Sequence, residues 1–260
     1  MVKRLWKLVA LSVTVCSAPV AAQQVADHVA MGVAANEAHD PRTALQHFEA
    51  ALEQDSSSYE ANWRAALTLL DLGEQTAPTG KSRKRDSLYA VAERYASRAV
   101  AADPGGADGH FALAAAVGRL ALDQGKKERI RRATVIRREA LRTIELNPRH
   151  DGAYHILGRW NAEIMRISGL SRFFAKTFMG AGVFGQASWG RAISNMEKAV
   201  KLDPGRIYHH LELARIYAER KRTADAKIQL HAVDSLPARE VMDSLYKQQG
   251  IDLGRRIAKR

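Results

Sequence analysis

The stretch that decides the fold reads His155-Ile156-Leu157-Gly158-Arg159-Trp160 and lies near the middle of the 260-residue chain. Its Leu157-Gly158 pair holds the same place in a repeating pattern as Met31-Gly32 and Leu213-Ala214. A small residue at this place lets one helix lie close against its partner helix. The chain around the stretch is therefore predicted to be a spiral of paired helices.

Three similar phrases stop helices on both sides of this stretch. Each is an amphipathic helix end followed by Asp-Pro or Asn-Pro, and they finish at Pro104, Pro148 and Pro204. Proline lacks a backbone N–H and disfavours helix in the residue before it, so each phrase ends a helix. The recurrence of these stops predicts a repeat protein.

Small residues recur at fixed distances before the stops. Ala192, Met196 and Ala199 precede Pro204 by 12, 8 and 5 residues, and three alanines precede Pro104 in the same way. This is the second-helix pattern of the tetratricopeptide repeat, which the chain resembles. We therefore predict an all-α fold, a tetratricopeptide-like right-handed superhelix of about five helical hairpins with a C-terminal capping helix.

The predicted repeats differ in length because inserts separate some of the paired helices. We expect units at about residues 24–58, 59–105, 106–148, 149–205 and 206–236, followed by a capping helix over 238–259. The second helix of the third unit is expected to run from about Lys126 to Leu146. Inserts in such repeats usually lie on one face and often carry the binding function.

Composition favours helices and a basic surface. Ala, Leu, Arg and Lys dominate, only 7 prolines occur, and alternating β-branched runs are absent after residue 16, so almost no sheet is expected. Lys and Arg number 40 against 28 Asp and Glu, which gives a formal charge of +12. This balance favours anionic partners such as acidic proteins or anionic lipid, or provides a solubilising surface.

The first 22 residues have the features of an export signal. Three basic residues precede a short apolar run, and Val20-Ala21-Ala22 resembles a signal-peptidase site, so the mature chain is expected to begin at Gln23. Cleavage there would remove Cys16, the only cysteine, and lower the formal charge to +9. We expect an exported protein, periplasmic or secreted. The alternatives are a cytosolic chain with an apolar N-terminus and a lipoprotein anchored at Cys16.

Three phrases in the fourth unit resemble one family in particular. They are His155-x-Leu-Gly-Arg-Trp160, Leu170-x-x-Phe-Phe-Ala-Lys176 and Ala192-x-x-x-Met-Glu-Lys-Ala199. Together they resemble the regulator of microtubule dynamics family, best over about residues 150–238. The resemblance implies a tetratricopeptide-like domain, association with microtubules and, in membrane-tethered members, lipid binding. Because an exported protein would not meet a microtubule, the expectations kept here are the fold and an apolar ligand.

The concave side of the predicted superhelix is the candidate binding surface, and its expected side chains are largely apolar. The candidate ligand- or partner-binding residues are Trp63, Phe111, His155, Arg159, Trp160, Arg172, Phe173, Phe174, Lys176, Phe178 and Arg215. An apolar groove must be covered. Insert 169–189 either fills the groove as core or closes as a lid over a lipid or other apolar ligand; a protein partner on the outer side of the insert is the third possibility.

Two of these residues also have purely structural interpretations. His155 could be a buried histidine whose ring bonds a backbone carbonyl. Arg159 could form a salt bridge to an acid on a neighbouring helix, and Glu163, one turn further along, is also well placed to pair with it. A basic stripe of Lys127, Arg131, Arg138 and Arg142 could similarly be a solvated helix face, or it could contact an anionic membrane surface.

No pattern in the sequence predicts catalysis. The glycine spacing of residues 180–185 matches a dinucleotide-binding fingerprint, but no strand is predicted before these residues. His209 and His210 are neighbours on a helix and point to different faces, so they are not expected to share a metal. We therefore expect a non-enzymatic scaffold without cofactor or metal. A protein partner is the first expectation, an anionic lipid or membrane surface the second, and nucleic acid is not expected.

Overall fold

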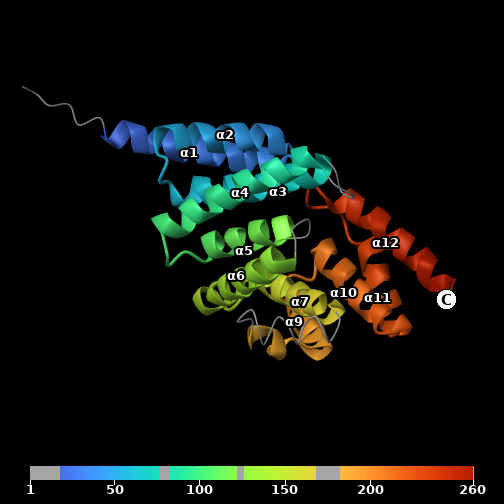
Figure 1. Ribbon diagram of the computed structural model, residues 1–260. Helices are drawn as coiled ribbons and strands as arrows, with labels where there is room; N and C mark the ends of the chain where they lie inside the picture. Colours follow the sequence, from blue (N-terminus) through green and yellow to red (C-terminus); the bar gives the residue numbers. More distant parts are fainter. Residues whose placement is uncertain (1–17, 77–81, 122–125, 168–181, 260) are drawn as a thin grey trace, which may run out of the picture.

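The computed structural model describes residues 18–76, 82–121, 126–167 and 182–259, which form a stack of antiparallel helix pairs (Figure 1). The pairs are α1 (Ala18–Glu37) with α2 (Pro41–Gln54), α3 (Tyr59–Thr76) with α4 (Arg83–Ala102), α5 (Ala107–Ala121) with α6 (Lys126–Leu146), α7 (Asp151–Arg166) with α9 (Trp189–Leu202), and α10 (Ile207–Glu219) with α11 (Thr223–Ser235). A short 3-10 helix, η1 (Gly182–Gln186), precedes α9, and α12 (Asp243–Ala258) ends the stack. The described residues contain no strand, as the sequence predicts.

The helix stops predicted from Asp-Pro and Asn-Pro are present, and each is a turn held by its own side chain. The carboxylate of Asp103 accepts a hydrogen bond from the backbone N–H of Gly105 at 2.9 Å. Asn147 and Asp203 accept equivalent bonds from the residues two positions on, at 3.0 Å each. The side-chain oxygen thus accepts from a backbone N–H that has no partner within a helix, while proline prevents another helical turn.

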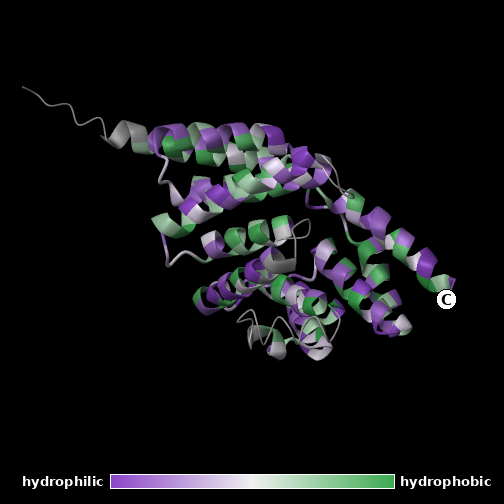
Figure 2. Ribbon diagram, viewed as in Figure 1, coloured by the Kyte–Doolittle hydropathy of each residue, from purple (hydrophilic) through white to green (hydrophobic). Residues whose placement is uncertain are grey.

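The small residues of the repeat pattern are buried where paired helices meet. Ala92, Ala96 and Ala99 of α4, and Ala192 and Ala199 of α9, have no exposed surface. Figure 2 shows apolar and hydrophilic residues interspersed along the helices of the stack. Each pair therefore shares a narrow apolar seam, and successive pairs stack through the remaining apolar faces.

Gly158 is a point of close approach between α7 and α9. A Cβ added to it would lie 3.0 Å from Met196 Cε and 3.2 Å from the backbone oxygen of Ala192. The glycine in the fold-deciding stretch is therefore required by the packing of the partner helix, as the sequence predicts.

The C-terminal helix begins later than predicted. The capping helix was expected from Ala238, but α12 starts at Asp243. The buried carboxylate of Asp243 accepts hydrogen bonds from the backbone N–H groups of Arg239 and Glu240, both at 2.8 Å. This side chain therefore holds a non-helical turn over residues for which the sequence pattern predicts helix. Residues 239–242, called the C-terminal strap below, consequently run across the concave side.

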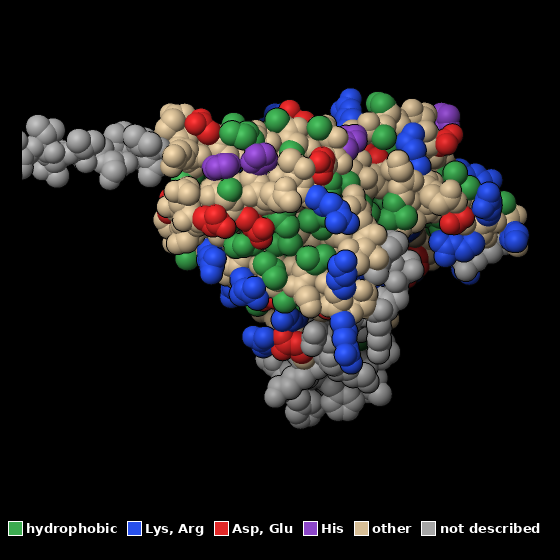
Figure 3. Space-filling model, turned by 90° about the horizontal axis from the view of Figure 1, so that it is seen from above, with side chains coloured by type: hydrophobic (Ala, Val, Ile, Leu, Met, Phe, Trp, Pro, Cys, Tyr) green, Lys and Arg blue, Asp and Glu red, His purple; other side chains and the backbone are tan. Residues whose placement is uncertain are grey.

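The described part of α6 carries its charges mostly as local ion pairs. Arg131 pairs with Glu128 at 2.6 Å, and Arg142 pairs with Glu145 at 2.9 Å. These pairs have the character of a solvated face. Figure 3 shows further basic side chains where the molecule ends at α12, whose last turn holds Arg255 and Arg256. None of the described helices combines the length and apolarity needed to cross a membrane.

Candidate ligand cavity on the concave side

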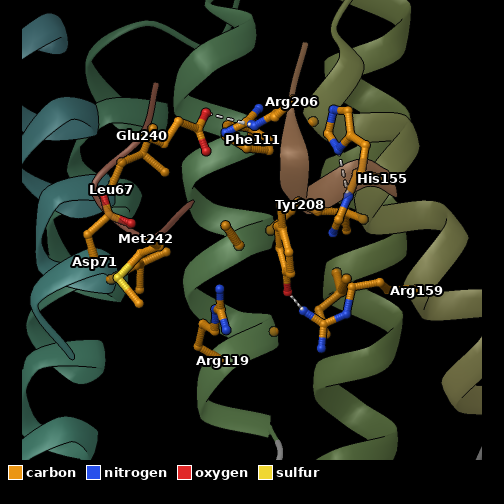
Figure 4. A pocket seen from close by; sticks show the side chains of 18 of the residues that line it. Leu67, Asp71, Phe111, Arg119, His155, Arg159, Arg206, Tyr208, Glu240 and Met242 are labelled. Atoms are coloured by element: carbon orange, nitrogen blue, oxygen red, sulfur yellow. Dashed lines mark hydrogen bonds and ion pairs between the residues drawn. The ribbon is translucent and has the colours of Figure 1, made fainter. Parts of the chain in front are cut away.

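A cavity of about 540 Å³ lies on the concave side of the stack (Figure 4). Its walls come from α3, α5, α7 and α10, and the C-terminal strap with Tyr246 covers one side. Pockets for small ligands typically measure about 300–1,000 Å³. The first helices of the repeats thus border a space of ligand size, and the strap covers one side of it.

Much of the cavity wall is apolar. The apolar lining includes Trp63, Leu67, Leu70, Phe111, Ile156, Trp160, Ile164, Phe184 and Met242. Trp160 is 5% exposed, and its indole N–H donates to the backbone oxygen of Ala133 at 2.7 Å. Its ring meets that of Phe184 edge to face, with centroids 6.0 Å apart. The wall on this side is therefore held in one geometry by both packing and a hydrogen bond.

Two arginines flank Tyr208 inside the cavity. The guanidinium carbons of Arg119 and Arg159 lie 6.0 and 5.8 Å from the centre of the Tyr208 ring. Arg159 also donates a hydrogen bond to the Tyr208 hydroxyl (Figure 4). Arg119 forms a close ion pair with Glu74 at 2.5 Å, whereas the carboxylate of Glu212 stands 3.7 Å from Arg159. Arg119 is therefore the more fully neutralised of the two.

A chain of hydrogen bonds joins α7 to α10 beside the arginines. Nδ1 of His155 lies 2.8 Å from Nδ1 of His209, and Nε2 of His209 lies 2.8 Å from the carboxylate of Asp151. Burial, then repulsion from His209 when that ring is protonated and from Arg159, hold the pKa of His155 well below its usual value. Burial also lowers the pKa of His209, although the bond to Asp151 opposes this. Both rings are consequently neutral at pH 7.

The C-terminal strap is tied to both ends of the stack. Arg206 bridges the carboxylates of Asp151 and Glu240, each at 2.9 Å. Tyr246 stacks on Tyr208, with ring centroids 4.3 Å apart and an angle of 10° between the planes. At the other end, the ring of His39 contacts the backbone oxygen of Arg239 at 3.0 Å. These contacts connect residues up to 200 positions apart and close the superhelix across its groove.

Asp71 of α3 faces the strap from the opposite wall (Figure 4). Burial, and then the nearby negative charge of Glu240, raise the pKa of Asp71 to about 7. The carboxyl group is therefore largely neutral below pH 7 and becomes charged above it. The ionised form would repel Glu240 in a poorly solvated space.

This raised pKa predicts a pH-dependent stability. Between about pH 4 and 7 the folded chain holds a proton on Asp71 that the unfolded chain has lost, so stability falls as the pH rises through this window. We expect the stability difference between the wild type and Asp71→Asn to fall over the same window and level off above pH 7. Urea unfolding at a series of pH values measures this difference.

Asp40→Asn is the control for the Asp71 measurement. Side-chain and backbone hydrogen bonds from Thr43 lower the pKa of Asp40, so its contribution is lost only as the pH falls below about 4. A difference that does not change with pH between 4 and 7 for Asp71→Asn would contradict the prediction.

The structure brings most of the described sequence-predicted site residues together. Trp63, Phe111, His155, Arg159 and Trp160 all line the cavity. Arg215 is not part of the lining; its guanidinium contacts Glu212 and Gln249. Arg172, Phe173, Phe174, Lys176 and Phe178 lie outside the described residues.

Of the two structural interpretations for α7, one is wrong and the other is confirmed in part. His155 does not bond a backbone carbonyl, because its Nδ1 faces the ring of His209. Arg159 does pair with an acid on a neighbouring helix, but that acid is Glu212 of α10, and Glu163 pairs with Arg166 at 2.5 Å instead. In both cases a partner from α10 takes the place of one from the same helix or its backbone.

Sequence reasoning missed the parts of the site that come from α10 and the strap, and one arginine of α5. Arg119, Tyr208, His209, Glu240 and Met242 line the cavity and were not among the predicted site residues. The sequence offered a signal only for Arg119 and Tyr208. Both are on first helices and lie on the same helix faces as other predicted groove residues. Nothing in the local pattern placed the strap inside the groove.

Solved structures of similar shape are tetratricopeptide-repeat proteins and related chains. The structure matches a thermophilic tetratricopeptide-repeat protein of Thermus thermophilus with a TM-score of 0.60 at 19% identity, covering 90% of this chain and 97% of that one. Pseudomonas aeruginosa pilF matches with a TM-score of 0.54 at 12% identity, over 92% and 93% of the two chains. The predicted fold class is thus confirmed: this is a tetratricopeptide-repeat-like helical scaffold. The chain belongs to the regulator of microtubule dynamics protein 1-3 family, whose sequence profile matches residues 25–255.

Curated relatives agree with this assignment. Regulator of microtubule dynamics protein 1 of Bos taurus is 25% identical over 151 residues, which are 58% of this chain and 46% of the relative. Regulator of microtubule dynamics protein 3 of Rattus norvegicus is 24% identical over 192 residues, 72% of this chain and 39% of the relative. This chain therefore spans less than half the length of these relatives, and the resemblance predicted from the sequence is confirmed at the level of the family.

Proposed function

We propose that the chain is a non-enzymatic scaffold that holds a lipid or other apolar ligand in its concave cavity. The observation that carries the proposal is a cavity of about 540 Å³ between largely apolar walls and the C-terminal strap. A site of this volume suits a ligand with one long apolar part. The tetratricopeptide-like fold alone supports only the broader role of a protein-interaction scaffold.

The placement of charge supports a ligand with an acidic end. Arg159 lines the cavity, keeps 28% of its side chain exposed and bonds Tyr208 through only one of its guanidinium nitrogens. Guanidinium groups bind carboxylates and phosphates strongly in such poorly solvated places. The apolar wall would take the hydrocarbon part, and Arg159 would meet the acidic group.

A protein partner is the second candidate function. The fold class favours it, and two large apolar side chains are exposed on the last helices, Ile228 of α11 at 64% and Ile251 of α12 at 43%. The C-terminal strap occupies the concave side, where a peptide would otherwise lie. A partner would therefore bind the outer surface while the cavity stays closed.

Filling the cavity separates the two candidates. Ala115 lines the cavity from α5, and Ala115→Phe would place a ring where at least two methylenes of a ligand would lie. Because each buried methylene contributes about 0.8 kcal/mol, binding of hexadecanoate should weaken at least about tenfold. Ala101→Phe, on the exposed end of α4, is the matched control.

Native mass spectrometry of the purified chain, followed by organic extraction, shows whether a lipid is bound. Equal hexadecanoate affinity for Ala115→Phe and Ala101→Phe, together with a chain that purifies empty, would reject ligand binding in the cavity. A specific partner lost from Ile228→Asp but kept by Ala115→Phe would then favour the second candidate.

We further propose that the chain acts in an exported compartment, after cleavage behind Ala22. The core of the first helix pair supports this, because the described valines of α1 in the cluster with Ala44 and Phe48 of α2, which are Val25, Val29 and Val33, all follow the cleavage site. Cleavage would therefore leave this packing intact. The intact mass of the chain recovered from the exported fraction should correspond to residues 23–260, whereas a full-length chain confined to the cytosol would reject the proposal.

A further inference from the structure

One residue of the cavity wall, His155, has a buried ring nitrogen without a hydrogen-bond partner among the described residues. His155 is 5% exposed and lines the cavity, and its Nε2 finds no hydrogen-bond partner in the part of the chain that the structure describes. Leaving a buried polar atom unpaired costs about 1–3 kcal/mol. An unpaired atom beside a ligand-sized space therefore indicates a polar group on the ligand.

The hydrogen-bond chain behind His155 decides what kind of group this is. Although burial opposes it, bonding from His209 and the charge of Arg206 keep the pKa of Asp151 below its usual range, so this carboxylate only accepts. His209 must therefore donate through Nε2 and accept at its Nδ1 from Nδ1–H of His155. Since a neutral imidazole carries one proton, Nε2 of His155 bears a lone pair. It can accept a hydrogen bond but cannot donate one.

Arg159 lies one helical turn from His155 on the same face of α7. One turn of helix advances about 5.4 Å. An acceptor and a cationic donor thus follow one another along one wall of the cavity. Tyr208 lies beside both, with its ring centroid 4.5 Å from that of His155 and the two rings tilted by 35° (Figure 4). A ligand that satisfies both needs a hydrogen-bond donor a few bonds away from its acidic group.

We propose that His155 and Arg159 together select an acidic amphiphile that carries a hydroxyl group near its acid group, such as a long-chain 3-hydroxy acid. The hydroxyl donates to Nε2 of His155, the acid group accepts from Arg159, and the hydrocarbon chain lies along the apolar wall. This selection rests on the proposed binding of an apolar ligand in the same cavity, and adds to it a preference for a hydroxylated ligand.

Three probes of one chain length test the preference on the full chain. They are 3-hydroxyhexadecanoate, hexadecanoate and 3-methoxyhexadecanoate, and isothermal titration calorimetry measures their affinities. We expect the hydroxy acid to bind at least about tenfold more tightly than either other probe, because only it pairs the buried acceptor. Equal affinity of the three probes would overturn the selection and leave the cavity function in place. Binding of none would overturn both.

Replacing the acceptor should remove the preference. His155→Phe keeps a ring in the wall but lacks Nε2, so the affinities of the three probes should converge. His231→Phe, at an exposed position on α11, should keep the preference. A tenfold preference that persists in a folded His155→Phe chain would overturn the assignment to this residue.

A measurement on the wild type covers the case in which His155→Phe does not fold. Nitrogen NMR of histidine-labelled protein distinguishes a free ring lone pair from one that accepts a hydrogen bond. The Nε2 resonance of His155 should move upfield when 3-hydroxyhexadecanoate is added and stay in place with hexadecanoate. An Nε2 resonance that responds alike to both probes would overturn the proposal.

Discussion

Replacing Trp160 with alanine should lower the free energy of unfolding by about 3–5 kcal/mol. The indole is 5% exposed, packs against Phe184, and donates its N–H to the backbone oxygen of Ala133. The substitution removes this buried surface and leaves a void that its neighbours on α6 and η1 cannot fill, since helix backbones hold them apart. Urea unfolding followed by circular dichroism measures the loss.

Two variants show which part of the effect comes from burial. Trp160→Phe keeps most of the ring and loses the bond to Ala133, so it should cost clearly less than the alanine variant. Trp63 lines the same cavity but is only partly buried, so Trp63→Ala should also cost less. An unfolding midpoint unchanged by Trp160→Ala would contradict the burial of this ring in the core.

The fold could be predicted because its determinants are local and repeated. Alanines at fixed offsets, and the stops at Asp103, Asn147 and Asp203, act within one helix pair, so the sequence pattern carries their effect. The same holds for the groove wall, because Trp63 and Phe111 occupy equivalent places on first helices. Repetition makes such positions visible without knowledge of the whole structure.

The remaining parts of the site depend on contacts that no local pattern records. His155 meets His209, and Arg159 meets Tyr208, through the stacking of one repeat on the next. The strap reaches the groove because the Asp243 carboxylate turns the chain before α12, and an isolated aspartate at a helix start gives no sign of this. Of the 169–189 insert that the sequence proposes as a cover, only residues 182–189 are described, and Phe184 among them lines the cavity; the C-terminal strap is a cover that the sequence does not predict.

Gly158→Ala and Gly118→Ala should change stability in opposite directions, although both place a methyl group within a first helix. Alanine has the higher helix propensity, by about 1 kcal/mol, at either position. At Gly118 the new Cβ would lie 3.9 Å from Ile136 Cδ1, an ordinary contact. We therefore expect Gly118→Ala to stabilise the chain by about 0.4–1 kcal/mol.

At Gly158 the crowding against α9 outweighs the same gain in helix propensity. The new Cβ would lie 3.2 Å from the backbone oxygen of Ala192 and the backbone nitrogen of Met196, and 3.0 Å from Met196 Cε. A side chain could turn away, but a helix backbone must move as a unit, so the crowding should cost about 1–3 kcal/mol. Urea midpoints of the two variants measure both changes in one experiment. If Gly158→Ala were as stable as Gly118→Ala, α7 and α9 would not be held together by close approach at this glycine, and the basis for interpreting the repeat pattern would be lost.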